Sequence, residues 1–451
     1  MTTKTTYKNM ITTTLLIIAT LLIQSCKKPT EPPPVDDNPI IKNTIILKVE
    51  WQELNRICLK FNKSIDDSTS LYKYTIKRKR EIGEEEVIAA FNIYGSDTTY
   101  IDGATDTLEM GKIYTYRITA SDKEENLKDT SNTITTATLS PTNQEIAWTI
   151  DTLGIPGNAG LYDIWGTDEN NVFAIGGITL PDGGSSVIKW NGRQWISVIN
   201  PPELILHGIY GFATDNIWIV GNGYGPWGGA AFYNGHSFTT FYLDPGNPKY
   251  SDTIYALYAV WGSAPDDVWA VGGHGTIIHW DGVEWKKVES PTEKLLTDIW
   301  GSSSNNIYAV GFSLINQAEI IHYDGNSWRN ITSELNTTKR GFRSIWVDKN
   351  NTAYAVGTSV INYNGLSWNT INVNQSKFLT RIRGRNSADI VAVGQRGRIH
   401  HFNGMVWKTY PELFKDTGTL NEIRGVIIFE KSIIGVGISH QGALVYRGKR
   451  N

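Results

Sequence analysis

Acidic and basic side chains recur near one repeated position in the second half of the chain. They are Asp163, Asp298, Arg343, Arg381, Arg383, Glu422 and Arg424. Two carboxylates at a suitable separation can cleave a glycosidic bond, and neighbouring arginines can hold a substrate carboxylate. Alternating charges that bridge neighbouring repeats explain the same residues more economically, without any ligand. The sequence leaves both interpretations open.

The histidines are the other residues with obvious chemistry. His279, His322 and His401 occupy the same position in three different repeats, so they cannot converge on one ion. His400 and His401 are adjacent and could hold an ion together, but no spacing typical of zinc, calcium or phosphate sites occurs. We therefore expect no metal and no cofactor.

Two long segments interrupt the repeat and offer a second kind of site. They are "GNGYGPWGG" (221–229) and "YLDPGNPKYSDTIYALY" (242–258). Their candidate ligand-binding residues are Tyr224, Trp227, Tyr242, Tyr250, Tyr255 and Tyr258. Exposed aromatic side chains among glycine, proline and carboxylates suit stacking on a sugar or packing on a protein loop. Loops that pack only on themselves are the alternative.

A repeat must position all of these residues. The segment "DIWGTDENNVFAIGG" returns as "AVWGSAPDDVWAVGG", "DIWGSSSNNIYAVGF" and further copies. The first aliphatic residues of the copies are Ile164, Ile209, Val260, Ile299, Ile345, Ile382 and Ile423. Because each copy alternates with period two and carries about four strands, the repeat predicts an all-β fold with a seven-bladed β-propeller over residues 144–451.

Smaller signals refine this propeller. An Asn-Gly or Asp-Gly pair, such as Asp281 and Gly282, joins the third and fourth strands and predicts a type I′ turn. Tryptophans such as Trp261 and Trp285 recur on strands and predict packing between blades. The last copy lacks its fourth strand, whereas "EIAWTIDTL" (145–153) precedes the first. We therefore expect residues 145–153 to pair with the last blade and close the ring.

Residues 42–140 form a separate unit. Six or seven short alternating segments and no helical stretch predict a β-sandwich. In "LEMGKIYTYRITASD" the spacing of Leu108, Gly111 and Tyr114 resembles the tyrosine corner of fibronectin type III domains. The resemblance implies a spacer or an adhesive module, with Phe61 in place of the usual buried tryptophan.

The N-terminus predicts the location. Residues 1–25 have a basic start and a short apolar run, as in a secretory signal. "LIQSC" resembles the lipobox of bacterial lipoproteins, which implies cleavage before Cys26, lipid on that thiol, and attachment to the outer membrane of a Gram-negative bacterium, facing the periplasm or the surface. Residues 26–41 are proline-rich and suit a tether.

Composition excludes one class of partner and leaves others. With 42 basic and 45 acidic residues the net charge is −3, which gives no basic excess for nucleic acid. The repeat "VWGSAPDDVWAVGGHGTIIHWDGVEW" resembles those of secreted and lipid-anchored bacterial proteins. We expect a non-catalytic envelope protein that binds a glycan or an envelope protein. A glycoside hydrolase or lyase with its site in the channel, and a structural component of an envelope complex, are the alternatives.

Overall fold

The structure is a computed structural model of the chain. It describes residues 42–65, 67, 72–157, 159–180, 183–198, 200–201, 204–223, 225–243, 254–313, 317–335, 341–373, 378–414 and 421–450. The predicted signal, Cys26 and the predicted tether lie outside these ranges. Regular structure in the described ranges is β-strand, apart from three single 3₁₀ turns at Gly273–Gly275, Thr332–Glu334 and Pro411–Leu413. No helix in these ranges has the length and apolar character of a membrane span.

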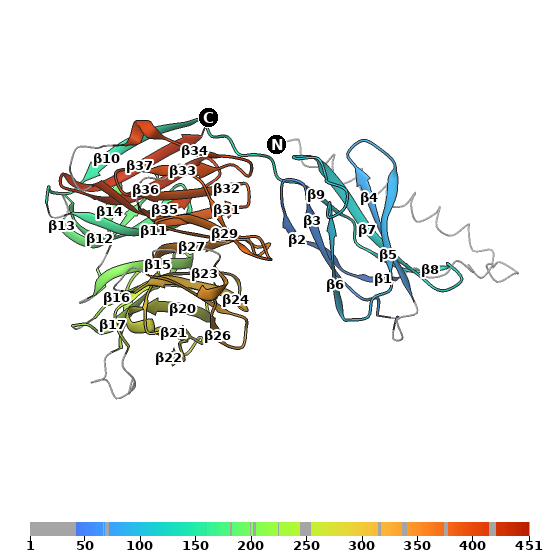
Figure 1. The fold of residues 1–451 in the computed structure, drawn as a ribbon, viewed down its shortest axis with the longest axis horizontal. Helices are drawn as coiled ribbons and strands as arrows, with labels where there is room; N and C mark the ends of the chain where they lie inside the picture. Colours follow the sequence, from blue (N-terminus) through green and yellow to red (C-terminus); the bar gives the residue numbers. More distant parts are fainter. Residues whose placement is uncertain are drawn as a thin grey trace, which may run out of the picture.

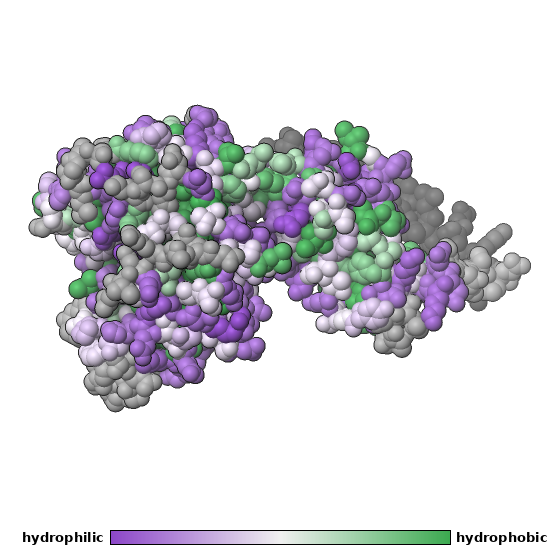
Figure 2. Space-filling view, in the orientation of Figure 1, coloured by the Kyte–Doolittle hydropathy of each residue, from purple (hydrophilic) through white to green (hydrophobic). Residues whose placement is uncertain are grey.

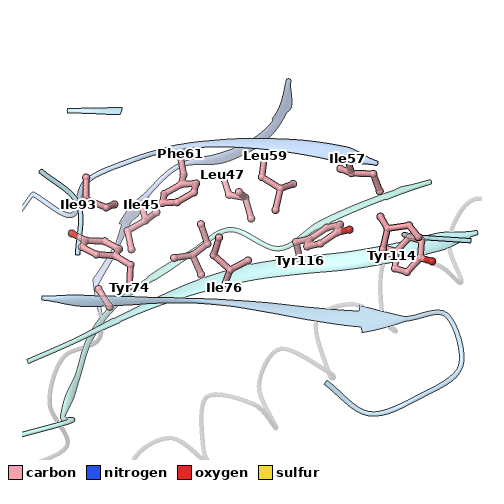
Figure 3. Packing of buried hydrophobic residues seen from close by; sticks show 13 residues of the cluster. Ile45, Leu47, Ile57, Leu59, Phe61, Tyr74, Ile76, Ile93, Tyr114 and Tyr116 are labelled. Atoms are coloured by element: carbon pink, nitrogen blue, oxygen red, sulfur yellow. The ribbon is translucent and has the colours of Figure 1, made fainter. Parts of the chain in front are cut away.

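The first body is a sandwich of two sheets (Figure 1). One sheet contains β1 (Lys42–Ile45), β4 (Lys73–Arg80), β5 (Glu85–Phe91), β7 (Ile113–Ser121), β8 (Leu127–Ser131) and β9 (Ile134–Ala137). The other contains β2 (Leu47–Gln52), β3 (Ile57–Asn62) and β6 (Asp97–Asp102). Alternate residues of each strand point inward. In Figure 3, Leu59 and Phe61 of one sheet therefore face Ile76 and Tyr116 of the other.

Local contacts in the sandwich agree with the sequence. The backbone N–H of Glu109 donates to Tyr114 Oη at 3.1 Å, and Tyr114 is buried. Gly111 has a φ of +66°, a backbone conformation that is strained for residues with a side chain. Tyr114 therefore fixes the turn before β7.

The second body contains sequential four-stranded antiparallel sheets. Three of them are β15 (Ile205–Ala213) to β18 (Phe238–Leu243) through β16 (Asn216–Asn222) and β17 (Gly228–Tyr233); β19 (Leu257–Ala264) to β22 (Trp285–Val288) through β20 (Asp267–Gly272) and β21 (Ile277–Trp280); and β23 (Leu295–Ser303) to β26 (Trp328–Asn330) through β24 (Asn306–Phe312) and β25 (Ala318–Tyr323). Two more are β27 (Phe342–Val347) to β30 (Trp368–Ile371) through β28 (Ala353–Gly357) and β29 (Val360–Tyr363); and β31 (Leu379–Asn386) to β34 (Trp407–Thr409) through β32 (Asp389–Gly394) and β33 (Ile399–Phe402).

The remaining strands form two further groups of four. One is β11 (Gly160–Asp168), β12 (Asn171–Leu180), β13 (Gly183–Trp190) and β14 (Trp195–Ser197). The other is β35 (Asn421–Ile428), β36 (Ser432–Ser439), β37 (Gly442–Arg450) and β10 (Ile146–Leu153). A single pair, Gly160 opposite Ile438, links the two groups into one sheet.

The first strands of the groups pack side by side in a ring. They contact one another in the order β11, β15, β19, β23, β27, β31, β35, and β35 contacts β11 again. Apolar clusters lie between neighbouring sheets, as where Trp261 and Trp269 meet Ile299 and Trp328. This is the arrangement of a β-propeller, and the packing expected of the repeated tryptophans is confirmed.

The predicted closing strand is also confirmed. β10 pairs antiparallel with β37 along its whole length, from Ile146 opposite Arg450 to Leu153 opposite Ala443. A segment that precedes the ring in the sequence thus covers the outer edge of its last strand.

The predicted type I′ turns are wrong. Such a turn needs positive φ at both central residues, but Asp281 is not among the residues with positive φ, whereas Gly282 has a φ of +88°. Asp281 Oδ1 instead accepts the backbone N–H groups of Val283 at 3.0 Å and Glu284 at 2.9 Å. The carboxylate replaces a backbone turn, and Asn191 bonds the turn in the same way in the first sheet.

The linker between the two bodies is attached to the propeller. Thr142 Oγ1 donates to the carbonyl oxygen of Ala388 at 2.7 Å, and Gln144 Nε2 donates to that of His401 at 2.7 Å. The side chain of Asn350 also donates to Glu53 of the sandwich. Figure 1 shows the linker that runs from β9 of the sandwich to the propeller. In Figure 2, hydrophobic residues on the visible surface form small groups among hydrophilic ones.

Candidate binding site at the mouth of the propeller channel

Each first strand of the ring carries a β-bulge near its start. The ladder with the second strand skips one residue, for example between Leu161 and Asp163 in β11. The skipped residues are Tyr162, His207, Tyr258, Thr297, Arg343, Thr380 and Arg424. A bulge turns its extra side chain out of the regular alternation. Each sheet of the ring thus presents one additional side chain at the same level.

These bulge residues meet around one cavity. All of them line a cavity of about 590 Å³, together with Ile205, Phe378, Arg381, Gln395 and Glu422. Its size lies in the range typical of ligand pockets. Tyr258, Arg343 and Arg424 were among the residues predicted from the sequence, whereas the other bulge residues were not. The signal was available, since in the first six repeats the bulge residue stands two positions before the repeating aliphatic residue.

The seventh repeat corrects the predicted position of Glu422. In β35 the ladder skips Arg424 between Ile423 and Gly425. Gly425 therefore corresponds to Asp163 of β11, and Val426, not Ile423, corresponds to Ile164. The predicted equivalence of Glu422 with Asp163 is wrong by three residues, because two aliphatic residues, Ile423 and Val426, both fit the repeating aliphatic position. Glu422 nevertheless lines the cavity.

Below the cavity, a buried ion-pair network closes the channel. Arg381 Nη2 lies 3.2 Å from Asp163 Oδ1, and its Nη1 lies 3.1 Å from Asp298 Oδ1. Arg383 Nη1 contacts Asp298 Oδ2 at 2.9 Å. Arg381 lines the upper cavity, while Asp163 and Arg383 line a separate cavity of about 90 Å³. We call Asp163, Asp298, Arg381 and Arg383 the channel cluster.

Burial and charge act against each other in the channel cluster. Burial raises the pKa of Asp163, and Arg381 reduces that rise only in part. For Asp298, burial also favours the protonated form, but Arg383 and Arg381 outweigh it and hold the pKa below its ordinary value. The backbone N–H of Ile345 donates to Asp298 Oδ2 at 3.0 Å. The aspartates thus join strands of different sheets, as the bridging interpretation predicts.

The catalytic interpretation needs two carboxylates facing one cavity. Asp163 and Asp298 are both bound by arginine below the cavity. Among the described residues that line the upper cavity, Glu422 supplies the one carboxylate. Glu422 Oε2 is itself 2.7 Å from Arg424 Nε. The described geometry therefore shows no pair of acids across the upper cavity.

The wall of the cavity combines rings and cations. The rings of His207 and Tyr258 stack at 4.9 Å with an interplanar angle of 23°. Arg424 lies over the ring of Tyr162 at 5.0 Å, and Arg343 lies over that of Phe312 at 4.4 Å. Burial lowers the pKa of His207, so its ring is neutral near pH 7 and bonds Asn222 Oδ1 through Nε2 at 2.9 Å. These contacts hold the wall side chains in place.

The aromatic residues of the two long segments separate into groups. Trp227 and Tyr255 form an isolated antiparallel bridge with rings 5.7 Å apart, and His274 packs on Tyr255 at 4.2 Å. Tyr242 packs against the core between two sheets, whereas Tyr258 lines the cavity. The predicted residues Tyr224 and Tyr250 lie outside the described residues. Trp227 and Tyr255 thus pack on each other.

The histidines are bonded within their own sheets. His279 Nε2 lies 2.7 Å from Asp267 Oδ1, and His401 Nε2 lies 2.8 Å from Asp389 Oδ1. His400 bonds Thr409 Oγ1 through Nδ1 at 2.8 Å. In the part of the chain that the structure describes, no group of three His, Cys, Asp or Glu residues could hold a metal ion.

Comparisons with known proteins support the fold. No family model matches the chain. Among curated proteins, immune protein Tsi7 of Pseudomonas aeruginosa is 34% identical over 64 residues, which are 14% of this chain and 21% of that protein. The chain therefore spans about a fifth of the length of this relative.

Two solved structures resemble the propeller. YCF48 bound to a D1 peptide aligns with a TM-score of 0.51 and 14% identity, over 69% of this chain and 97% of that one. The WD40 β-propeller domain of Doa1 aligns with a TM-score of 0.48 and 14% identity, over 68% of this chain and 98% of that one. At this identity the YCF48 likeness concerns the fold alone. The chain is all-β and has β-propeller proteins among its structural neighbours.

Proposed function

We propose that this chain is a non-catalytic, lipid-anchored protein of the cell envelope whose propeller binds a segment of a partner protein. The binding site is the cavity at the mouth of the channel. In this proposal the ring has seven blades, the sandwich is a fibronectin type III-like spacer, and Cys26 carries the lipid at the outer membrane. The observation that carries the proposal is the convergence of the bulge residues on one cavity.

The chemistry of the cavity supports recognition. Bulge residues are not needed to continue the strand ladder, yet here they include tyrosine, histidine, threonine and arginine. Aromatic residues and arginine are enriched where proteins contact partners. The channel cluster below the cavity engages Asp163 and Asp298 in ion pairs, which weakens the case for a glycan-cleaving enzyme. YCF48, which has a similar fold, was solved bound to a peptide, and we carry that ligand class over as part of the proposal.

Photo-crosslinking tests the location of the site. A photoreactive phenylalanine analogue at Thr297, inside the cavity, is expected to capture a discrete envelope protein in living cells. The same analogue at Val283, which is 78% exposed on an outer turn, serves as the control. The captured segment is then identified by mass spectrometry and synthesised.

A substitution that fills the cavity tests whether the partner segment binds there. Thr297→Trp places an indole in the cavity and is expected to abolish binding of that synthetic segment. Thr149→Trp, on the exposed outer strand β10, should leave binding intact. Equal capture from positions 297 and 283, or binding that survives Thr297→Trp, would refute the site. Glycan-array binding that Thr297→Trp abolishes would replace the protein partner with a glycan.

A further inference from the structure

Resting on the proposed function, we infer that the cavity takes a carboxylate of the bound segment, held by Arg343 and Arg424. An apolar side chain next to that carboxylate lies against Ile205 and Phe378. The source of the carboxylate is either the C-terminus of the partner chain or an acidic side chain.

Arg343 is the main basis of this inference. It lines the cavity from β27, and stacking on Phe312 at 4.4 Å fixes its guanidinium. Among the described residues, no hydrogen bond or ion pair satisfies this group. A guanidinium has five N–H donors and no acceptor, and it stays charged in proteins. Arg343, whose side chain is exposed to solvent, therefore presents a fork of donors that no described residue fills.

Arg424 supplies a second guanidinium on the same cavity. It uses Nε to bond Glu422 at 2.7 Å, and neither of its Nη groups bonds a described residue. The pKa of Arg343 is lowered, mainly by partial burial, while Glu422 acts to raise it and Arg424 to lower it. All three side chains line the same cavity. Two guanidinium groups against one carboxylate leave one positive charge.

The channel cluster does not neutralise this charge. Its two arginines, Arg381 and Arg383, already face Asp163 and Asp298. The hydroxyls of Thr297 and Thr380 donate to backbone carbonyls of their own and the neighbouring sheets. The positively charged donors left on this cavity are therefore the N–H groups of Arg343 and Arg424, beside the neutral hydroxyl and amide groups of Tyr162, Tyr258 and Gln395. A carboxylate matches such a fork with two parallel bonds.

Ile205 and Phe378 supply the apolar part of the inferred binding site. Both line the same cavity and give it an apolar wall beside the guanidinium groups. A ligand that carries only charge would leave this wall in water. A peptide residue that joins a carboxylate to an apolar side chain covers both.

Pools of fluorescent hexapeptides test the inference on the full-length chain in mild detergent. One pool has a free C-terminus and no acidic side chain. A second is amidated and contains one Asp or Glu, and a third is amidated with no acid. Oligogalacturonate provides a fourth, non-peptide carboxylate. Binding is measured by fluorescence anisotropy, or by calorimetry for the sugar.

We expect at least one carboxylate pool to bind about tenfold more tightly than the neutral pool, because a charge-assisted pair adds that much. Arg343→Gln should reduce the affinity for that pool to the affinity for the neutral pool. Arg343→Lys should restore part of the difference in affinity. Arg329→Gln, at an exposed arginine of β26, should change nothing. Preference for the first pool identifies a C-terminus, and preference for the second identifies an acidic side chain.

Other outcomes separate the inference from the function on which it rests. If all peptide pools bind equally and Thr297→Trp blocks that binding, the inferred carboxylate recognition is refuted, but the cavity remains a peptide-binding site. If oligogalacturonate alone binds tightly, the proposal that the ligand is a peptide segment is refuted. No binding above the Thr297→Trp background by any probe overturns both.

Discussion

Arg450, at the end of β37, donates through Nη2 to the buried carboxylate of Asp389 in the neighbouring sheet, with 2.6 Å between Nη2 and Oδ1. Asp389 also accepts a bond from Arg385 Nε at 2.5 Å and contacts His401 Nε2 at 2.8 Å. The last strand is thus fixed twice, by pairing with β10 and by this ion pair to β32.

Arg450→Ala should loosen the closure of the ring. Removing one partner of a buried ion pair is costly, but Arg385 and His401 still face Asp389, so we expect a loss of about 1–2 kcal/mol. Urea unfolding measures the loss, and hydrogen exchange should show faster exchange in β10 and β37. Lys449→Ala, at the exposed neighbouring residue, is the control. A normal exchange pattern in the Arg450 variant would show that strand pairing alone closes the ring.

The channel cluster and the cavity should respond differently to loss of an acid. Asp298→Asn leaves Arg383 without its buried partner, and we expect about 3–5 kcal/mol of destabilisation. Glu422→Gln removes a carboxylate at the solvent-accessible rim and should cost under about 1 kcal/mol. Both values come from urea unfolding. Equal losses would show that Glu422 is structural, and catalytic turnover lost in either variant would revive the enzyme interpretation.

The buried Asp348, next to the sandwich, should make stability depend on pH. Burial first, and then the charge of Glu53, raise the pKa of Asp348 to about 6. The unfolded chain releases this proton near pH 4. Stability from this group is therefore present below about pH 4 and is lost as the pH rises to about 6.

Asp348→Asn should remove that dependence. The amide oxygen can still accept the N–H of Lys349, as Asp348 Oδ1 does at 2.8 Å. We expect the variant to be roughly 1–3 kcal/mol more stable than the parent at pH 7.5, with a difference that shrinks towards pH 4. Asp266→Asn, at an exposed residue, is the control. Parallel stability curves for parent and Asp348→Asn would contradict the effect.

The turn at Asp281 offers a test of side-chain capping. Asp281→Asn keeps an acceptor for the N–H groups of Val283 and Glu284 and should change stability by less than about 0.5 kcal/mol. Asp281→Ala removes the acceptor and should cost about 1 kcal/mol. Thermal unfolding of the two variants gives the comparison. Identical melting curves would mean that Gly282 alone determines the turn.

The ring of strands could be predicted from the sequence, but the contacts between side chains in the channel could not. Aliphatic, glycine and tryptophan residues recur at fixed places because every sheet meets a similar neighbour, so the strands and the closing segment were predictable. The contact between Arg381 and Asp298 joins residues 83 positions apart, and periodicity does not say which side chains meet across a channel. The turn type was also ambiguous, because Asp-Gly suits both a positive φ and a side-chain bond.

The bulges were hardest to foresee. The bulge position recurs in the sequence, but the sequence does not show that this residue lies outside the ladder, so Tyr162 and His207 looked like ordinary strand residues. In β35, Ile423 and Val426 are both aliphatic, and only the ladder opposite β36 decides between them.

If the cavity binds a partner as proposed, the bulges also separate recognition from folding. Because each skipped residue lies outside the ladder, a substitution there would then alter what the cavity accepts and leave the pairing of the sheet intact. Seven such positions form a ring that selection can vary one by one. Relatives of this chain are therefore expected to keep the tryptophans and glycines of the repeat while the residues at the seven bulges diverge with the partner.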